Sequence, residues 1–248
     1  MNTHSVNAAP FTASGRGCAG RNVILAVVLL LNACTAAPVR APDSAAVVAD
    51  SADALTDSIR ATADRARITG DTAAALWLII ASDFECPYCA QWHRESHDSI
   101  RARYVEPGLI RIAYLNYPLD QHRHARNAAN AALCAGAQDR FWEVHDAIFE
   151  TQEHWTTLAD AGPAFESLAS EAGLNMAAWR SCVADGVMDP VVRSDRERAA
   201  SAGVQSTPTF LVLPTKPPAR PGQLIRGAVP LTELKQVLDS LLMSPGGP

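Results

Sequence analysis

The sequence lacks the features that mark several common classes of protein. Its 21 Lys and Arg residues are scattered, and no dense basic block accompanies the net charge of −5, so nothing in it indicates a nucleic-acid-binding surface. We find no internal repeat. Six cysteines occur but only one C-x-x-C pair, so a four-cysteine zinc site has no support. A chain of 248 residues can bury a core without cross-links, and its cysteines therefore need another explanation.

The chain also lacks an apolar run of the roughly 20 residues that a membrane-spanning helix needs. Arg16 and Arg21 precede the apolar stretch 23–31, whose length is typical of a signal peptide. The segment 31–34, Leu-Asn-Ala-Cys, resembles the lipobox of bacterial lipoproteins, in which the cysteine, here Cys34, carries the lipid. Cleavage nearby with release into the periplasm and an uncleaved anchor are the alternatives. All three place the rest of the chain outside the cytoplasm, where disulfides persist.

A C-x-x-C pair, Cys86 and Cys89, organises the body of the chain. It follows the apolar run 76–81, typical of a buried strand, and opens a predicted helix at 90–104. A helix N-terminus favours a thiolate through its unpaired backbone N–H groups and its dipole. The thiolate is the nucleophile of disulfide exchange, so we expect Cys86 to attack and Cys89 to resolve the mixed disulfide. Pro87 suits the first helical position.

Residues 76–104, together with Thr-Pro-Thr-Phe at 207–210, resemble the thioredoxin-fold oxidoreductases, and more narrowly their DsbA-like branch in bacterial envelopes. The resemblance extends from about 67 to 242. It implies an α/β fold class: a thioredoxin fold with a central mixed sheet flanked by helices and a helical insertion of about 60 residues at 121–187. We expect no cofactor.

Four segments are expected along the chain. They are a lipoprotein-type signal peptide at 1–34, a tether at 35–66 that is helical in part, the thioredoxin-like domain at 67–242 and a disordered tail at 243–248. Apolar and β-branched runs predict strands at 66–69, 76–81, 109–115, 209–213 and 223–227. Helical spacing predicts helices over 51–66, 90–104, several parts of 121–186, 190–202 and 231–241.

The resemblance also gives roles to four residues around the sulfurs. It implies that the Thr207-Pro208 bond is cis, that it lies against the cysteines and that it leaves backbone groups free for a substrate strand. It implies that Pro87 and Tyr88, between the cysteines, set the redox potential. Known potentials of this fold run from about −270 mV in thioredoxin to about −120 mV in DsbA.

One position departs from the family pattern. Thioredoxin-fold enzymes often bury an acidic residue six positions before the first cysteine, and here Ile80 stands at that place. Asp83 and Glu85 lie closer to the motif, and we expect both to be solvated in an exposed turn. If either approached Cys86 instead, like-charge repulsion would raise the pKa of the thiol.

The cysteines of the body are Cys86, Cys89, Cys134 and Cys182, and four cysteines allow three pairings. The C-x-x-C spacing assigns the first two to each other and leaves Cys134 with Cys182. We expect the second pair to be a structural disulfide that pins the helical insertion, in an oxidising compartment. A second redox pair and two unpaired thiols are the alternatives.

We expect no metal site. Cys89, His93 and His97 fall on one helix face, but a straight helix spreads them over about 12 Å, too far for one zinc ion. His93 and His97 are expected to pack or to lie on a solvated surface, and His93, one turn from Cys89, could tune the thiols. The remaining candidates are expected to be solvated or locally hydrogen-bonded histidines, His122, His124 and His154, and core or groove tryptophans, Trp92, Trp142, Trp155 and Trp179.

The function predicted from these residues is that of an envelope thiol–disulfide oxidoreductase, most readily a disulfide donor. Its expected partners are exported proteins with cysteines and a membrane or periplasmic redox protein that resets the Cys86–Cys89 pair, with the lipid on Cys34 as membrane anchor. A reductase or isomerase of the same fold is one alternative. A non-catalytic lipoprotein that holds unfolded chains near Thr207-Pro208 is the other.

Overall fold

The computed structural model describes residues 44–216 and 222–243. The expected signal peptide at 1–34, with Cys34, lies outside the described residues, as does nearly all of the predicted tail at 243–248. No helix in the described part of the chain combines the length and the apolar composition that crossing a membrane requires.

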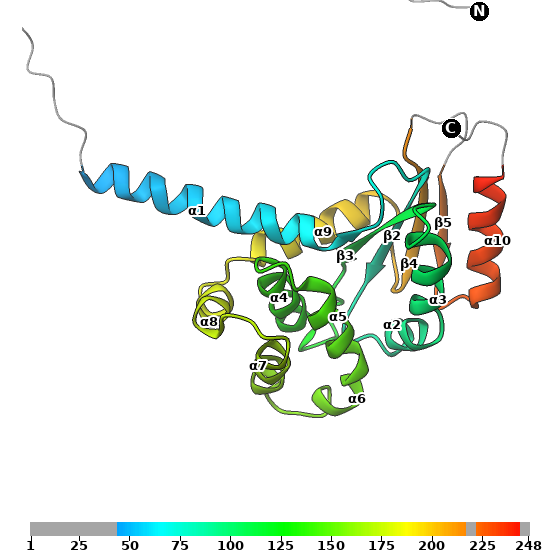
Figure 1. Cartoon of the computed structure of the whole chain (residues 1–248). Helices are drawn as coiled ribbons and strands as arrows, with labels where there is room; N and C mark the ends of the chain where they lie inside the picture. Colours follow the sequence, from blue (N-terminus) through cyan, green and yellow to red (C-terminus); the bar gives the residue numbers. More distant parts are fainter. Residues whose placement is uncertain (1–43, 217–221, 244–248) are drawn as a thin grey trace, which may run out of the picture. The chain divides into compact units, whose positions relative to one another are not determined.

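A mixed five-stranded sheet forms the centre of the fold (Figure 1). In chain order its strands are β1 (Ile68–Thr69), β2 (Leu76–Ser82), β3 (Ile110–Asn116), β4 (Thr209–Pro214) and β5 (Gln223–Arg226). In space they follow the order β1-β3-β2-β4-β5. β2 runs parallel to β3 and antiparallel to β4, so the expected mixed sheet is confirmed. The apolar runs predicted as strands at 76–81 and 109–115 are β2 and β3.

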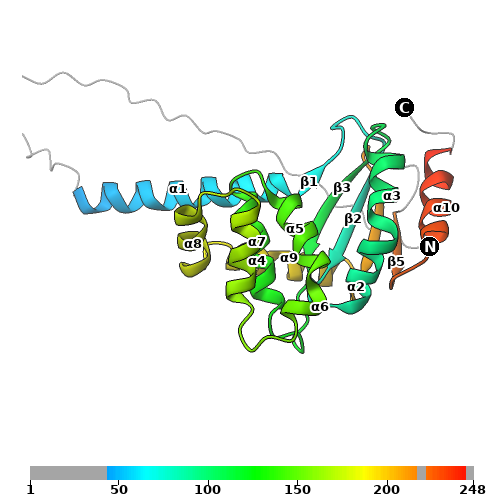
Figure 2. The same ribbon diagram turned by 60° about the horizontal axis from the view of Figure 1, so that its bottom comes forward.

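Helices connect and cover the strands. They are α1 (Ser44–Ala66), α2 (Pro87–Trp92), α3 (Asp98–Ile100), α4 (Ala125–Gly136), α5 (Phe141–Glu150), α6 (Gln152–Trp155), α7 (Gly162–Glu171), α8 (Met176–Ala184), α9 (Asp189–Ser201) and α10 (Leu231–Leu242). Figures 1 and 2 show α2, α3 and α10 on one side of the sheet and α9 on the other.

Both faces of the sheet are buried, as the near-continuous apolar run of β2 predicts. Successive residues of a strand point to opposite sides, so each face has its own core. Leu78 packs with Leu238 of α10 on one face, and Ala81 packs with Ala199 of α9 on the other. A fully buried leucine such as Leu78 contributes about 1.5–3 kcal/mol to stability.

Residues 87–105, which follow a short turn after β2, are helical throughout but do not form one regular helix. α2 passes into a π-helical turn, η1 (His93–His97), and α3 passes into a second, η2 (Arg101–Val105). A π turn bonds residues five apart and therefore widens the helix locally. η1 buries both of its histidines, whose rings stack with centroids 4.9 Å apart. The sequence pattern predicts the helix at 90–104 but not these two turns.

The expected helical insertion is present as α4 to α8, within the predicted range 121–187. One face of α4 consists of small residues, and its buried Ala128 and Ala132 let the neighbouring helices approach closely. α5 adds the fully buried Val144 and Ile148 to the same core. This core also takes in both cysteines of the C-x-x-C pair, so the insertion forms part of the wall around them.

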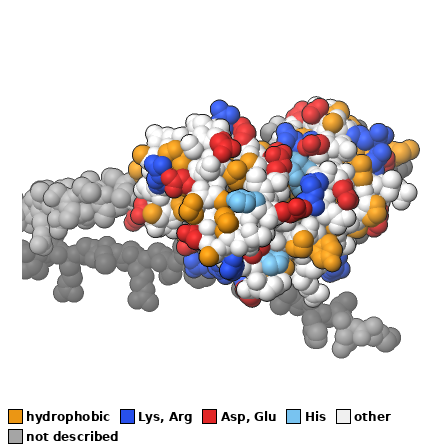
Figure 3. Space-filling view, turned by 90° about the horizontal axis from the view of Figure 1, so that it is seen from below, with side chains coloured by type: hydrophobic (Ala, Val, Ile, Leu, Met, Phe, Trp, Pro, Cys, Tyr) orange, Lys and Arg blue, Asp and Glu red, His pale blue; other side chains and the backbone are white. Residues whose placement is uncertain are grey.

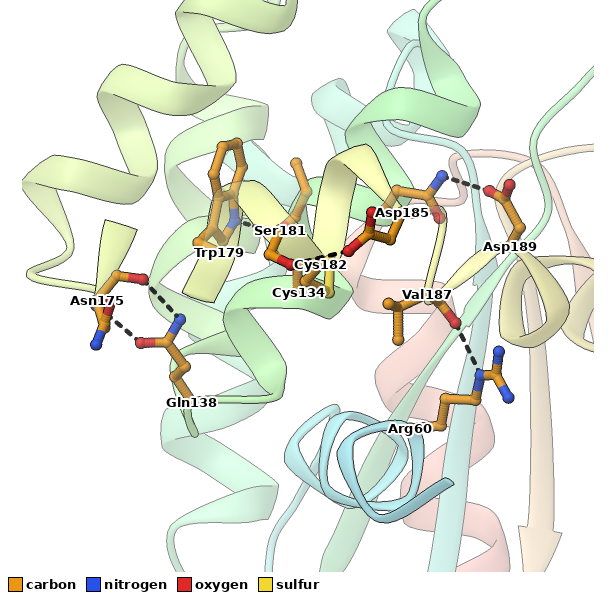
Figure 4. The surroundings of a disulfide bond; sticks show 12 residues. Arg60, Cys134, Gln138, Asn175, Trp179, Ser181, Cys182, Asp185, Val187 and Asp189 are labelled. Carbon is orange, nitrogen blue, oxygen red and sulfur yellow. Dashed lines mark hydrogen bonds between the residues drawn. A yellow bond between two sulfur atoms is a disulfide. The ribbon is translucent and has the colours of Figure 1, made fainter. Parts of the chain in front are cut away.

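Cys134 of α4 and Cys182 of α8 are joined by a disulfide, with their Cα atoms 5.8 Å apart. Figure 4 shows the bond between these two helices, with Trp179 beside it. The indole Nε1 of Trp179 donates to the carbonyl of Ala131 at 3.1 Å, so α8 is attached to α4 at a second point. This position, inside the insertion, supports a structural role.

The segment expected as a tether is helical over a longer stretch than the predicted 51–66, because α1 begins at Ser44. Its C-terminal part is not a tether. Ala63 is fully buried in the core of the insertion, and Arg60 Nε donates to the carbonyl of Val187 at 2.8 Å (Figure 4). Leu55, nearer the start of the same helix, is 63% exposed.

Removing the disulfide is predicted to destabilise the insertion without removing the activity of the C-x-x-C pair. The bond closes a loop with a sequence separation of 48 residues, so the double variant Cys134→Ala/Cys182→Ala should lose about 2–4 kcal/mol of unfolding free energy, measured by urea unfolding of the oxidised protein. The matched control, Cys86→Ala/Cys89→Ala, removes a pair three residues apart and should change stability less. A double variant that stays as stable as the wild type but no longer oxidises thiols would assign Cys134 and Cys182 to electron relay.

Candidate active site

Cys86 lies at the tip of a helix, as the N-cap residue of α2, with φ −72° and ψ 121°. Its carbonyl accepts the first helical hydrogen bonds, from the backbone N–H of Cys89 at 3.1 Å and of Ala90 at 3.2 Å. Pro87 occupies the first turn, where its missing N–H costs nothing. The sequence therefore places the first sulfur where unpaired N–H groups favour an anion.

The two sulfurs are buried, whereas the residues between them are exposed. Cys86 is 3% exposed and Cys89 1%, and both are free thiols. Pro87 is exposed, and Tyr88 is 63% exposed. An approaching molecule therefore meets a proline and a tyrosine before it reaches the sulfur of Cys86.

A loop from far along the chain lies against Cys86. The sulfur of Cys86 is 3.5 Å from the carbonyl oxygen of Thr207, and the Thr207–Pro208 peptide bond is cis. Both residues of that bond are buried. The Pro208 carbonyl accepts from the N–H of Gly227 at 2.8 Å, and Thr209 Oγ1 donates to the carbonyl of Ser206 at 2.7 Å. The structure thus brings together the cysteine pair and the Thr-Pro pair that the sequence analysis singled out.

The two thiols have opposite acidities. A hydrogen bond from the Cys89 thiol lowers the pKa of Cys86 to about 6, against the opposing effect of burial, and the Thr207 side chain and the backbone N–H groups of Cys89 and Tyr88 act in the same direction as that bond. Burial raises the pKa of Cys89 well above its usual value, and the nearby Cys86 sulfur raises it further. At neutral pH, Cys86 is therefore the thiolate and Cys89 the thiol that stabilises it.

The polar groups next to Cys89 are hydroxyls. Ser82, at the end of β2, acts on Cys89 through a side-chain hydrogen bond that lowers the pKa of this thiol. Burial, followed by the nearby Cys89 sulfur, raises the pKa of Tyr114 well above its usual value. Ile80, at the position where related enzymes often bury an acid, is 2% exposed in the core.

The expectation that both Asp83 and Glu85 are exposed is wrong. Asp83 is 2% exposed and Glu85 is half-buried. The Asp83 carboxylate accepts from the N–H of Glu85 and the N–H of Leu119, each at 2.8 Å, and its Oδ2 lies 2.7 Å from Nδ1 of His122. Burial raises the pKa of Asp83, and the bond from Leu119 N–H opposes this effect. The carboxylate thus joins its own turn, through Glu85 N–H, to the loop after β3, through Leu119 N–H and His122, and the sequence around Asp83 does not reveal this second set of contacts.

Gln152 is a site residue that the sequence analysis missed. It belongs to α6 of the insertion, and its Nε2 donates to the carbonyls of Phe84 at 2.7 Å and Cys86 at 3.0 Å. One amide therefore holds the turn that precedes the first sulfur. No local pattern distinguishes this glutamine from any other helical glutamine.

The histidines after the cysteine pair are buried and are not part of a site with Cys89. Burial lowers the pKa of His97 to about 3 and that of His145 of α5 to about 4. The metal-ligating side chains that gather within the described residues are His93, His97 and Asp146 of α5. His122 and His124 are hydrogen-bonded to residues distant in sequence, the Asp83 carboxylate and the Leu158 carbonyl, instead of being solvated or bonded locally as expected. On the face shown in Figure 3 charged side chains of both signs are interspersed with histidines.

Comparison with known proteins relates this chain to one family. A family model described as thioredoxin matches residues 62–216. The chain is 22% identical to alpha-DsbA1 of Wolbachia pipientis, whose crystal structure superposes with a TM-score of 0.63 over 71% of this chain and 90% of that one. At this identity the superposition shows the fold, and it confirms the expected thioredoxin fold with a DsbA-like insertion.

The curated relatives include antiporters and disulfide bond formation proteins. A Na(+)/H(+) antiporter NhaA of Salinispora tropica is 32% identical over 133 residues, which are 53% of this chain and 19% of that protein. A probable disulfide bond formation protein D of Bacillus anthracis is 23% identical over 133 residues, 52% of this chain and 61% of that protein. The chain thus spans about a fifth of the length of the first relatives it matches.

Alkylation of reduced protein should show the acidity of Cys86. We predict that the rate of iodoacetamide modification at this thiol rises with a midpoint near pH 6, and that Cys89→Ala moves the midpoint up because the hydrogen bond from the Cys89 thiol is lost. Because folding lowers the pKa of Cys86 from an unfolded value of about 8.5, ionisation of this thiol stabilises the folded, reduced protein. The contribution is fully present above about pH 8.5 and is lost as the pH falls through 6. A wild-type midpoint near 8.5 would contradict the site.

Asp83→Asn is predicted to destabilise the protein by about 1–3 kcal/mol. Each carboxylate oxygen of Asp83 accepts a hydrogen bond from a backbone N–H, whereas the asparagine amide would turn its NH₂ group toward one of these N–H donors. Urea unfolding measures the change. The control is Asp71→Asn, an exposed aspartate that also accepts a backbone N–H, from Ala73 at 2.8 Å, and should stay within about 0.5 kcal/mol of the wild type. Equal losses of unfolding free energy in both variants would show that burial of the Asp83 carboxylate does not increase its contribution to stability.

Proposed function

The chain belongs to the thioredoxin family, and on that premise we propose that it is a protein thiol–disulfide oxidoreductase that works through Cys86 and Cys89. One observation carries the proposal. Cys86 lies at a helix tip, has its pKa lowered to about 6 and touches the Thr207 carbonyl at 3.5 Å. The name of the Bacillus anthracis relative, a probable disulfide bond formation protein, agrees with it.

In the proposed cycle the oxidised enzyme carries a Cys86–Cys89 disulfide. A client thiolate attacks the Cys86 sulfur, a mixed disulfide forms at Cys86, and Cys89 leaves as the thiolate and takes up a proton. A second client thiolate then attacks the client sulfur of the mixed disulfide, and Cys86 leaves as a thiolate. The client gains a disulfide, and its two electrons pass to the enzyme as two reduced thiols.

We propose that the enzyme acts in this direction, as a disulfide donor. Groups that stabilise the Cys86 thiolate stabilise the reduced enzyme and so make its disulfide a better oxidant. The pKa of about 6 lies between those of the attacking cysteines in thioredoxin, about 7, and DsbA, about 3.5. We therefore expect a potential between about −270 and −120 mV.

The clients and the compartment belong to the same proposal. The signal-like stretch 23–31 and Cys34 support export and lipid anchoring in the bacterial envelope, with a soluble periplasmic form as the alternative. Clients are then exported proteins with cysteines, and a membrane or periplasmic partner reoxidises the reduced pair. The exposed Tyr88, two residues after Cys86, offers these proteins an aromatic surface close to the cysteine pair.

The test combines an activity assay with trapping. Oxidised wild type should introduce disulfides into a reduced model protein, Cys86→Ala should be inactive, and Cys89→Ala should accumulate mixed disulfides through Cys86 that mass spectrometry identifies. Wild type and Cys86→Ala with equal, negligible activity would indicate a polypeptide-binding protein. A measured potential below about −270 mV would indicate a reductase instead of a disulfide donor.

A further inference from the structure

A second group of polar side chains is buried where η1 meets α5 of the insertion. η1 contributes His93, 8% exposed, and His97, fully buried. α5 contributes His145, 2% exposed, and Asp146, whose side chain is 28% exposed. None of the four takes part in the thiol chemistry described above, so their burial needs a separate reason.

The carboxylate of Asp146 faces three imidazoles. Its Oδ1 lies 3.0 Å from Nε2 of His93, 3.9 Å from Nδ1 of His97 and 2.7 Å from Nδ1 of His145. One potential ligand atom each from His93, His97 and Asp146 lie within 4.8 Å of one another. Zinc bonds of about 2.0–2.2 Å in a tetrahedral site put ligand atoms about 3.3–3.6 Å apart, so shifts of a few tenths of an ångström to about 1 Å would place these atoms at three of the four positions and leave the fourth to water.

The hydrogen bonds of this group are incomplete. Within the described residues, neither ring nitrogen of His97 has a hydrogen-bond partner, and Nδ1 of His93 has none. A polar group buried without a partner costs about 1–3 kcal/mol, and His97 is fully buried. A cation between His97 and Asp146 would give one of these nitrogens the partner that it lacks.

The spacing and the donor types agree with a transition metal. His93 and His97 are four residues apart, the spacing at which two histidines of one helix face hold zinc in H-E-x-x-H sites. Two imidazoles and one carboxylate suit zinc, whereas magnesium and calcium prefer oxygen ligands throughout. The Nδ1 of His145 is within hydrogen-bond distance of Asp146 Oδ1 and would orient this carboxylate from outside the ligand set.

We propose that His93, His97 and Asp146 bind one divalent transition-metal ion, with zinc as the expected metal. Two further charged groups face the site. Arg101 Nη1 lies 3.6 Å from Asp146 Oδ2, the oxygen turned away from the imidazoles, and Asp98 Oδ1 lies 3.6 Å from His97 Nδ1. The two carboxylates outnumber the single guanidinium, so the local charge favours a cation. The bound ion ties η1, directly after the active-site helix, to the insertion.

The test must exclude zinc binding by the active-site thiols. Calorimetric titration with Zn²⁺ therefore uses the full chain in the Cys86→Ser/Cys89→Ser background, and Co²⁺ provides a second readout through its visible absorption. We expect one ion per chain in this background. His93→Gln and Asp146→Asn should each weaken binding at least tenfold, while His154→Gln, which alters an exposed histidine outside the group, should leave it unchanged.

Two results would overturn the proposal. One is the absence of Zn²⁺ binding by the Cys86→Ser/Cys89→Ser protein when its circular dichroism matches that of the wild type. The other is equal affinity in Asp146→Asn and His154→Gln, which would place the ion elsewhere. Because Asp146→Asn is nearly isosteric, it supports the conclusion even if His93→Gln fails to fold. Neither result bears on thiol exchange, which the trapping experiment tests separately.

Discussion

The contact between the Cys86 sulfur and the Thr207 carbonyl joins parts of the chain that lie 121 residues apart, and the active site depends on it. Three independent elements have to be in place for the contact to form. α2 must begin directly after Cys86, the loop before β4 must turn at Pro208, and Gln152 must hold the carbonyls of Phe84 and Cys86. The sheet satisfies the first two conditions, because β2 and β4 are direct antiparallel neighbours and their ends meet at this edge.

The helical insertion, like the sheet, contributes residues that hold the turn before Cys86. Phe84, two residues before the first sulfur, packs against Tyr114 of β3 and Phe149 of α5, with ring centroids 5.0 and 4.9 Å away. Phe84, in the turn that leads to the cysteine pair, is therefore packed between the sheet and the helical insertion. Burial in this environment lowers the acidity of Cys89, whereas the acidity of Cys86 is raised by its hydrogen bonds, first of all that from the Cys89 thiol, against the effect of burial.

Local patterns predict the parts of this structure that local physics determines. The apolar runs of β2 and β3, the turn at Pro87 and the helical character of the insertion follow from composition and spacing, and the fold follows from the cysteine motif taken with Thr207-Pro208. The thiol acidities could be predicted in direction, since a helix N-terminus favours the Cys86 thiolate.

What the sequence does not reveal depends on residues that meet only after folding. Asp83 is expected in water because carboxylates usually are, yet it is buried against a distant loop, where it accepts from Leu119 N–H and pairs with His122. A straight helix spreads Cys89, His93 and His97 over about 12 Å, and the structure gathers only His93 and His97, which stack on each other, with Asp146 of α5. No sequence motif around Gln152 or Asp146 indicates its role. Both belong to the insertion, and their contacts with the cysteine turn and with η1 form only when the chain folds.

The bond between Cys134 and Cys182 makes the protein a substrate of the type of reaction proposed for it. The body of a newly made chain contains four reduced thiols, and its insertion is cross-linked only after two of them have been oxidised. An oxidised older copy, or another oxidant of the same compartment, has to accept those electrons. The number of mature molecules then depends on how oxidising their surroundings are, and a shortage of oxidant reduces the supply of new enzyme as well as the turnover of the old.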